Sequence, residues 1–286
     1  MEPGLFTMGS PESEFDRIDD ENQTQVTLTQ GFYLGKYEVT QSEYESVMEG
    51  ASDDLSATPS NWPGNPNRPV DRVSWNDIQV FLTRLNELEA DNIENGWSFV
   101  LPTEAEWEYA CRAGNNTAYN WGDLIQPSNA NFSDSGNFQT QDVGQYLPNA
   151  WGFYDMHGNV WEWTADWYQS YSNGPLVDPE GPENGSHKSL RGGAWSNGGA
   201  NLRSARRGYD LPDGRHNSLG FRIVYQLQPD ILAPTINLVG GTNVLHKRDE
   251  LWQDPGFDVS DERDGNLTNS VTISGSVDVS ITGSTP

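Results

Sequence analysis

The residues best suited to chemistry lie in one segment, GFYDMHGNVWEWTADW, which occupies positions 152–167 and is called the signature segment below. Asp155, Asn159 and Glu162 offer side-chain oxygens within a few positions of one another, and the turn at Gly158 can direct a backbone carbonyl toward them. Ca²⁺ takes about six to eight such hard oxygens, often from irregular loops. The segment therefore predicts a structural calcium site. The alternative is that Asn159 and Glu162 only tie the loop together by hydrogen bonds.

Six arginines form the second notable group, because they fall within one short stretch of a chain that has only 16 basic residues. Guanidinium groups hold carboxylates bidentately and stack on aromatic rings. The group therefore either binds an anionic ligand or clamps acidic loops of the fold itself, and clamping is the interpretation we favour. The six are Arg191, Arg203, Arg206, Arg207, Arg215 and Arg222.

Composition limits the classes of function. The 286 residues carry a formal charge of −26, which argues against binding nucleic acid or an anionic membrane, since both need a cationic surface. No apolar run is long enough to span a membrane. The single cysteine excludes an intramolecular disulfide, and the four histidines stand singly, without a paired metal-binding spacing.

Three short helices are expected to position these residues. Thr40, Ser74 and Thr103 each precede a helical pattern as N-caps, and Glu43 and Glu106 complete capping boxes. Residues 24–40 alternate polar and apolar side chains around a glycine, which predicts a hairpin. The proline-rich residues 51–72 predict a surface loop. We expect an irregular, loop-rich chain whose core is largely aromatic.

The order of several blocks resembles the formylglycine-generating enzyme (sulfatase-modifying factor) family over about residues 6–225. The blocks are FTMGS, GKYEVTQSEYESVM, RPVDRVSWNDIQVFLTRLN, LPTEAEWEYACRAG, the signature segment, LRGGAWSNGGANLRSARRG and NSLGFRIV. The resemblance implies an α+β, loop-rich variant of the C-type lectin fold, held by aromatic packing and bound calcium. It also implies a second calcium site through Asn131 and the backbone of Phe132, which Asp134 or Asp142 would have to complete here.

The same resemblance implies copper chemistry that this chain is not expected to perform. Family oxidases hold copper through two cysteine thiolates in the block after the Arg-Gly-Gly turn, and hydroxyls or amides cannot replace them. Here Ser196, Asn197 and Asn201 stand near those positions, and the one thiol, Cys111, lies on a predicted helix as a small core residue. Related sulfoxide synthases need a three-histidine iron site, which the scattered histidines do not provide. Copper and iron are therefore not expected, and calcium is the cofactor we predict.

Beyond the main domain, assigned to residues 1–226, we expect a linker at 227–233 and a partial β-sandwich at 234–286. The string DPGFDVSDERDGNLTNSV resembles bacterial surface immunoglobulin-like modules, and turns are predicted at 240–241, 264–265 and 275. The start MEPGLFTMGS lacks the pattern of a signal sequence. We infer a secreted or bacterial cell-surface location from the domain content.

Two classes of function remain open. The first is a calcium-stabilised extracellular recognition or scaffold module that takes a protein, glycan or peptide ligand. Its candidate ligand-binding residues are Trp195, Ser196, Asn197, Asn201, Arg203, Arg206 and Arg207. The second is a divergent protein-modifying oxidoreductase of the same family. The ligand itself and the oligomeric state are not predicted.

Overall fold

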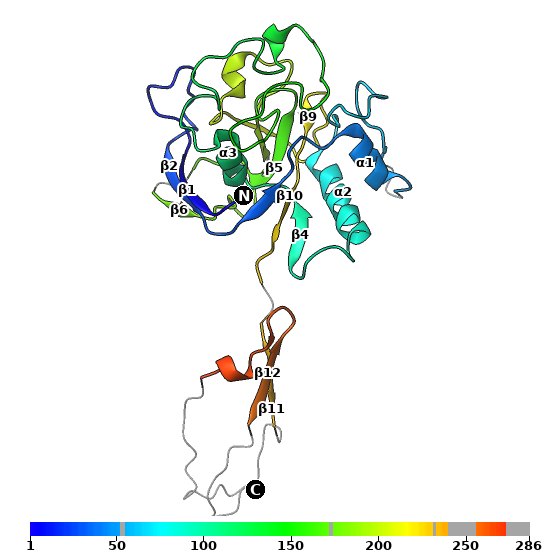
Figure 1. Cartoon of the computed structure of the whole chain (residues 1–286), viewed down its shortest axis with the longest axis vertical. Coiled ribbons are helices and arrows are strands. Elements are labelled where there is room, and N and C mark those ends of the chain that lie inside the picture. The colour runs from blue at the N-terminus through cyan, green and yellow to red at the C-terminus, as the bar shows by residue number, and fades with distance from the viewer. Residues whose placement is uncertain (52–54, 172–173, 231–232, 240–255, 273–286) are drawn as a thin grey trace, which may run out of the picture. The chain divides into compact units, whose positions relative to one another are not determined.

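A computed structural model describes residues 1–51, 55–171, 174–230, 233–239 and 256–272 of the chain. The chain divides into two compact units, Met1–Leu227 and Gln228–Pro286. Figure 1 shows the first unit as a body of short strands and helices joined by long loops. No helix among the described residues is long and apolar enough to cross a bilayer.

The three predicted helices are confirmed, and each begins at its predicted cap. The caps Thr40, Ser74 and Thr103 each form a capping box, with Glu43, Asp77 and Glu106 respectively. Helix α3 ends at Ala113, which takes the left-handed conformation at φ 47° just before Gly114. The helices are α1 (Gln41–Met48), α2 (Trp75–Leu88) and α3 (Glu104–Arg112).

The described residues of the first unit also form three small sheets. The first has the order β1-β2-β6, the second β3-β10-β4 and the third β8-β7-β5-β9. Two 3₁₀ turns, η1 (Ser133–Ser135) and η2 (Gly199–Leu202), lie in the loops. The strands are β1 (Gly4–Met8), β2 (Thr24–Leu28), β3 (Phe32–Leu34), β4 (Trp97–Val100), β5 (Trp161–Trp167), β6 (Leu176–Val177), β7 (Lys188–Arg191), β8 (Arg207–Asp210), β9 (Leu219–Gly220) and β10 (Val224–Leu227).

The hairpin predicted for residues 24–40 is wrong, although both of its strands exist. Strand β2 pairs with β1 in the antiparallel register Val26↔Phe6, and β3 pairs instead with β10, at the far end of the unit. Alternation along a strand specifies which side chains are buried but not which strand is the partner. Here β2 and β3 each pair with a strand outside the predicted hairpin.

The core is aromatic, as expected. Tyr44 of α1 stacks on Phe81 of α2 at 5.3 Å between ring centroids, and Phe81 meets Phe221 edge to face at 5.2 Å. Trp163 of β5 and Trp107 of α3 are fully buried. Helix α1 packs on α2, and α3 packs on β1, β5 and β7. The unit is thus the predicted α+β, loop-rich fold.

The second unit contributes strands β11 (Thr235–Leu238), β12 (Phe257–Asp261) and β13 (Gly265–Asn266), followed by the turn η3 (Thr268–Ser270). The strands form an antiparallel sheet. The turn predicted at 264–265 is confirmed: Gly265, at φ 73°, pairs with Asp261 across it. The turns predicted at 240–241 and 275 lie outside the described residues, so the immunoglobulin-like sandwich stays a prediction.

Candidate functional site

The signature segment makes a tight turn before it enters β5. Asp155, Gly158 and Asn159 all have positive φ, at 56°, 97° and 63°. Only glycine fits at position 158, because a β-carbon there would lie 2.3 Å from the carbonyl oxygen of Asn131. The backbone N–H of Asn159 donates to that same oxygen at 2.9 Å. The turn therefore brings the two predicted calcium-binding segments, around residues 131 and 155, into direct contact.

Glu38 is a buried acid at this junction that sequence reasoning missed. It accepts hydrogen bonds from Asn159 Nδ2 at 2.7 Å and from the Val160 N–H at 3.2 Å. Burial raises its pKa well above the ordinary value, and the charge of Asp155 adds to the effect. Burial also raises the pKa of Asp155 to about 6. The acid in GKYEVT, next to the buried Val39, was the only signal for Glu38 in the sequence.

Glu162 is held by protein donors. Arg222 Nε and Nη2 donate to its two oxygens at 2.6 and 2.7 Å, and Trp107 Nε1 donates at 2.7 Å. Both Glu162 and Arg222 are fully buried. These contacts favour the interpretation that Glu162 ties the loop together. The fit to calcium is therefore partial: Asp155 retains one oxygen, Oδ1, that accepts no hydrogen bond among the described residues, and Glu162 retains none.

The donors of the second predicted calcium site also have protein partners. Asn131 Oδ1 accepts from Ser135 Oγ at 3.1 Å and from Asn137 Nδ2 at 3.0 Å. The Phe132 carbonyl accepts from Ser135 Oγ at 2.7 Å. Of the two expected substitutes, Asp134 accepts from Ser133 Oγ and Asp142 accepts from Asn65 Nδ2. The residues predicted for the second calcium site therefore make hydrogen bonds within the protein, and these bonds order the loop.

The loop predicted to bind a ligand, residues 195–201, lies directly on the signature turn. The N–H of Trp195 donates to the Asn159 carbonyl at 2.9 Å, and its indole N–H donates to the Asn217 carbonyl at 3.1 Å. Trp62 meets the Trp195 ring edge to face at 5.2 Å. Ser196 is exposed beside this half-buried tryptophan pair. The loop thus presents an aromatic edge and a hydroxyl from a fixed backbone.

The other polar residues of that loop serve the loop itself. Asn197 Oδ1 accepts from the Ala194 N–H at 3.0 Å, and the Asn197 carbonyl accepts from Ser133 N at 2.9 Å. Asn201 Oδ1 accepts from Arg206 Nε at 3.2 Å. The loop therefore has two turn-forming amides, and the Ser196 hydroxyl has no hydrogen-bond partner among the described residues.

Cys111 lies apart from that surface. It is fully buried on α3, with its sulfur 3.8 Å from the Met156 carbonyl and 3.6 Å from His157 Nε2. Burial raises the pKa of the thiol to about 12, so almost no thiolate is present at neutral pH. His157 Nδ1 lies 2.6 Å from the Leu202 carbonyl, and Nε2 accepts from the Asn120 N–H at 3.2 Å. This pair belongs to the core.

Two of the three candidate ligand-binding arginines are buried clamps. Arg203 Nη1 donates to Glu14 at 2.6 Å and to Glu21 at 2.7 Å. Arg207 donates to both oxygens of Glu104, at 2.6 and 2.8 Å. Arg206 is half-buried, with Asn201 as its described side-chain partner.

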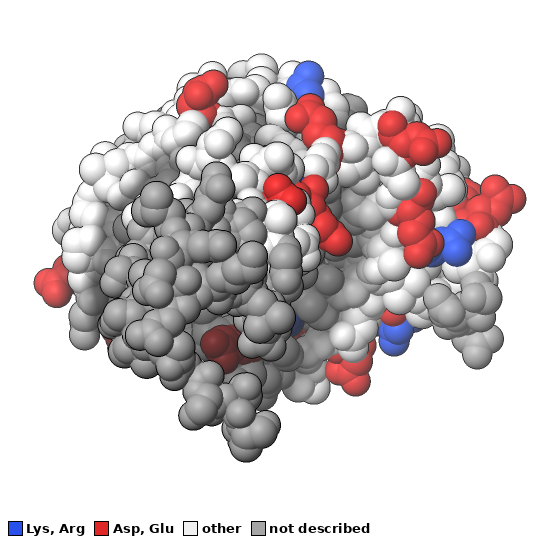
Figure 2. Space-filling view, turned by 90° about the horizontal axis from the view of Figure 1, so that it is seen from below, with Lys and Arg blue, Asp and Glu red and all other residues white. Residues whose placement is uncertain are grey.

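On the face of the protein seen in Figure 2, acidic side chains are spread widely and only isolated basic ones lie among them.

One further group was not predicted. Asp230, Asp261 and Asp264 of the second unit form the only set of three acidic or metal-binding side chains, among the described residues, whose ligand atoms lie close enough to share an ion. Exposed acids often gather in this way without an ion.

Comparison with known proteins identifies relatives of the first unit. The model of the sulfatase-modifying factor enzyme 1-like domain matches residues 1–227. A formylglycine-generating enzyme from Mus musculus is 29% identical over 281 residues, spanning 77% of this chain and 72% of the mouse protein. One from Streptomyces coelicolor is 35% identical over 193 residues, spanning 61% of this chain and 55% of that protein.

Solved structures agree on the fold. PvdO from Pseudomonas aeruginosa superposes with a TM-score of 0.71 at 28% identity, covering 79% of this chain and 93% of PvdO. Treponema denticola variable protein 1 superposes with a TM-score of 0.67 at 24% identity, covering 80% of this chain and 94% of that one.

Proposed function

Because the chain belongs to the sulfatase-modifying factor enzyme 1-like family, we propose that it uses this scaffold for extracellular recognition or assembly, without oxidising cysteine. The observation that carries the proposal is the set of side chains in residues 195–201. Two thiolates are what a cuprous ion requires, and this loop has Ser196, Asn197 and Asn201 instead. The only thiol in the chain, Cys111, is buried and protonated. Family membership names the scaffold, and its chemistry depends on these side chains.

The surface proposed for recognition centres on Trp195 and Ser196. Aromatic edges with a nearby hydroxyl suit the apolar faces and polar rims of sugars and peptides, and aromatic residues dominate many binding hot spots. The Asn159 carbonyl holds the Trp195 backbone N–H, and the Asn217 carbonyl holds its indole N–H. Trp195 is therefore preorganised and loses little entropy on binding.

A binding screen tests this surface. The full chain is applied to arrays of glycans and peptides, and the hits are measured again with Trp195→Ala. Because truncating a hot-spot residue costs about 2 kcal/mol or more, we expect Trp195→Ala to weaken binding by at least that amount. Trp151→Ala is the matched control, since Trp151 is a partly exposed tryptophan outside the loop. Equal losses for the two variants, or no hits at all, would count against the proposal.

Calcium is part of the same proposal as a structural ion at the signature turn. Its support is two neighbouring carboxyls, the buried Glu38 and the half-buried Asp155, whose pKa values are raised first by burial and then by nearby acids. A hard divalent cation would stabilise their charged forms. We expect chelator to lower the melting temperature of the wild type and to have a smaller effect on Asp155→Asn. An unchanged melt in chelator would remove calcium from the account.

A further inference from the structure

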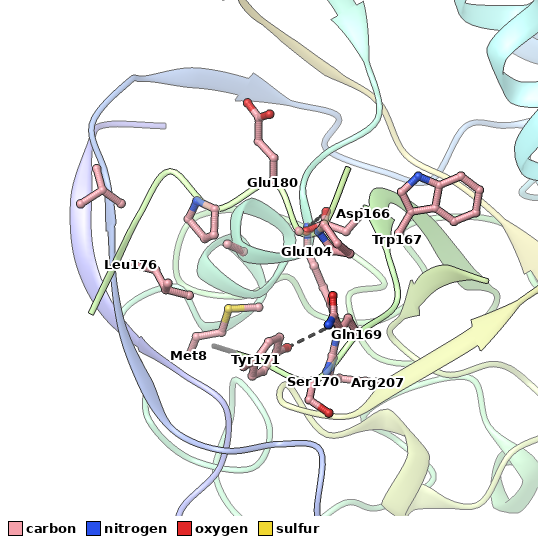
Figure 3. Close-up of a pocket in the computed structure, with 15 residues that line it drawn as sticks. Met8, Glu104, Asp166, Trp167, Gln169, Ser170, Tyr171, Leu176, Glu180 and Arg207 are labelled. Carbon is pink, nitrogen blue, oxygen red and sulfur yellow. Dashed lines mark hydrogen bonds and ion pairs between the residues drawn. The ribbon is translucent and has the colours of Figure 1, made fainter. Parts of the chain in front are cut away.

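A second concave site lies away from the residues considered so far. A cavity of about 420 Å³ opens between the start of α3, the end of β5 and residues 176–182. Figure 3 shows Met8 and Leu176 on the side opposite Trp167, with Glu104 and Asp166 between them in this view. Three carboxylates line the cavity, those of Glu104, Asp166 and Glu180.

The charge of Glu104 is already balanced. Arg207 holds both of its oxygens, and Tyr171 Oη donates to Oε1 at 3.3 Å. The Arg207 guanidinium also lies over the rings of Tyr171 and Tyr168, at 4.0 and 4.6 Å from their centroids. Burial opposes ionisation of Glu104, but the attraction of Arg207 outweighs it and lowers the pKa. Arg207 is therefore engaged, which argues against an anionic ligand here.

Asp166 has no such partner. Its side chain is 5% exposed, and Oδ2 accepts the N–H of Glu104 at 2.7 Å, at the start of α3. No described residue donates to Oδ1. Lys188 is the basic residue closest to Asp166 in sequence. It donates to the Ala165 carbonyl at 2.7 Å, and its ammonium lies over the rings of Trp75 and Trp167. Burial, then Glu104, raises the pKa of Asp166 to about 8.

The charges around Asp166 are mainly acidic: Glu104 and Glu106 raise its pKa, and Arg207 opposes them. Glu106 of α3 has a raised pKa, mainly from burial, with contributions from Asp178 and Glu180. Glu180 is exposed at the rim of the cavity. A buried carboxylate with an unused oxygen, beside other acids, favours a ligand that brings positive charge and hydrogen-bond donors.

We propose that this cavity binds an alkylammonium group, with the ammonium at the Asp166 carboxyl, below the rim where Glu180 adds negative charge, and its carbon chain against Met8, Leu176 and Val177. The cavity lies within the size range of small-molecule sites, about 300–1,000 Å³. An ammonium on an apolar stem matches walls that are part carboxylate and part aliphatic. A divalent ion fits less well, because no three acidic ligand atoms here lie within reach of one ion, as judged over the described residues.

Two sources carry this group, a free diamine and a lysine side chain of a peptide. Calorimetric titration of the full chain with cadaverine and with Nα-acetyl-lysine amide measures each directly. We expect at least one to bind, and its fully acetylated counterpart, in which every amine is an uncharged amide, to fail. Tighter binding of the lysine compound identifies a peptide partner, and tighter binding of cadaverine identifies a free amine. Either result supports the site.

Variants locate the binding. Asp166→Asn should weaken the amine by about tenfold or more, because it removes the buried carboxyl that a bound ammonium would hold in its charged form. Glu180→Gln should weaken it by about two- to fivefold, because Glu180 is an exposed acid at the rim. Glu180 is exposed, so Glu180→Gln tests the site even if Asp166→Asn disturbs the fold. Glu183→Gln, at another exposed acid nearby that does not line the cavity, should bind like wild type.

Three results would overturn the proposal: no binding of either amine, equal binding of the acetylated compound, or binding unaffected by both Asp166→Asn and Glu180→Gln. Calcium chloride is titrated as a separate arm. Calcium binding that Asp166→Asn abolishes, without amine binding, would also overturn it. The Trp195 surface is not involved in any of these outcomes.

Discussion

Removing Arg222 should destabilise the first unit severely, because Glu162 depends on it. Glu162 and Arg222 are both fully buried and share two hydrogen bonds of 2.6 and 2.7 Å. In Arg222→Met the carboxylate keeps only Trp107 Nε1 as a described partner. Leaving one member of a buried pair uncompensated costs about 3–5 kcal/mol. That is a large fraction of the roughly 5–15 kcal/mol by which domains are stable.

Two further losses act in the same direction. Arg222 also donates to the Gly35 and Tyr154 carbonyls, each at 3.0 Å, and each unsatisfied buried carbonyl costs up to about 1–3 kcal/mol. We therefore expect a loss of at least about 3 kcal/mol. The free energy of unfolding is measured by urea titration, followed by tryptophan fluorescence, with the slope checked for constancy.

The double variant separates pairing from general damage. Arg222→Met combined with Glu162→Gln removes both charges, so its loss should be smaller than the sum of the two single losses by at least about 2 kcal/mol. Arg215→Met is the control: Arg215 pairs with Asp77 but its side chain is 47% exposed, so its loss should stay within about 1 kcal/mol. Additive losses, or an Arg222→Met loss as small as that of the control, would refute the reasoning.

Further predictions concern the signature turn, a helix cap and a buried acid. Gly158→Ala should prevent folding or lower the melting temperature sharply, because its β-carbon would meet the Asn131 carbonyl at 2.3 Å; Gly50→Ala, at φ 71° with open space around it, should cost only about 1–2 kcal/mol. Thr103→Ala should cost about 0.5–2 kcal/mol in urea titration, since it removes the N-cap of α3; a loss near zero would contradict the capping role. Burial raises the pKa of Asp71 to about 7 from 3.8, so the folded state favours the neutral acid and this contribution is lost as the pH rises between those values. Relative to wild type, Asp71→Asn should gain about 2–3 kcal/mol between pH 5 and pH 8, and an equal difference at both values would exclude this origin.

The sequence predicts the helices well because their signals are local. Thr103 and Glu106 stand three positions apart, and the capping box they form needs nothing from the rest of the chain. The hairpin at 24–40 fails for the opposite reason, since the partner of β3 is β10, nearly two hundred positions later. Strand pairing depends on contacts that no local pattern encodes.

In the candidate site, too, local features could be predicted from the sequence, whereas contacts between distant residues could not. The glycine turn at Gly158 could be recognised from its neighbours, but its contact with Asn131 could not. The clamping role favoured for the arginines agrees with the buried pairs of Arg203 and Arg207, although their partners, Glu21 and Glu104, are distant in sequence. Glu162 was predicted as a calcium ligand because the sequence does not show that Arg222, 60 positions away, is its hydrogen-bond partner. Glu38 was missed because nothing in its own segment indicates burial beside Asp155.

The central claim is that this family member lacks the oxidase chemistry, and one assay tests it most directly. The full chain is loaded with Cu(I) and incubated in oxygenated buffer with a cysteine-containing peptide, beside a formylglycine-generating enzyme of the family. Oxygen consumption and peptide mass are then followed together. The account predicts no oxygen uptake beyond that of the same copper and peptide without the protein, and no formylglycine in the peptide. Formylglycine formed at a rate comparable to that of the family enzyme would contradict it.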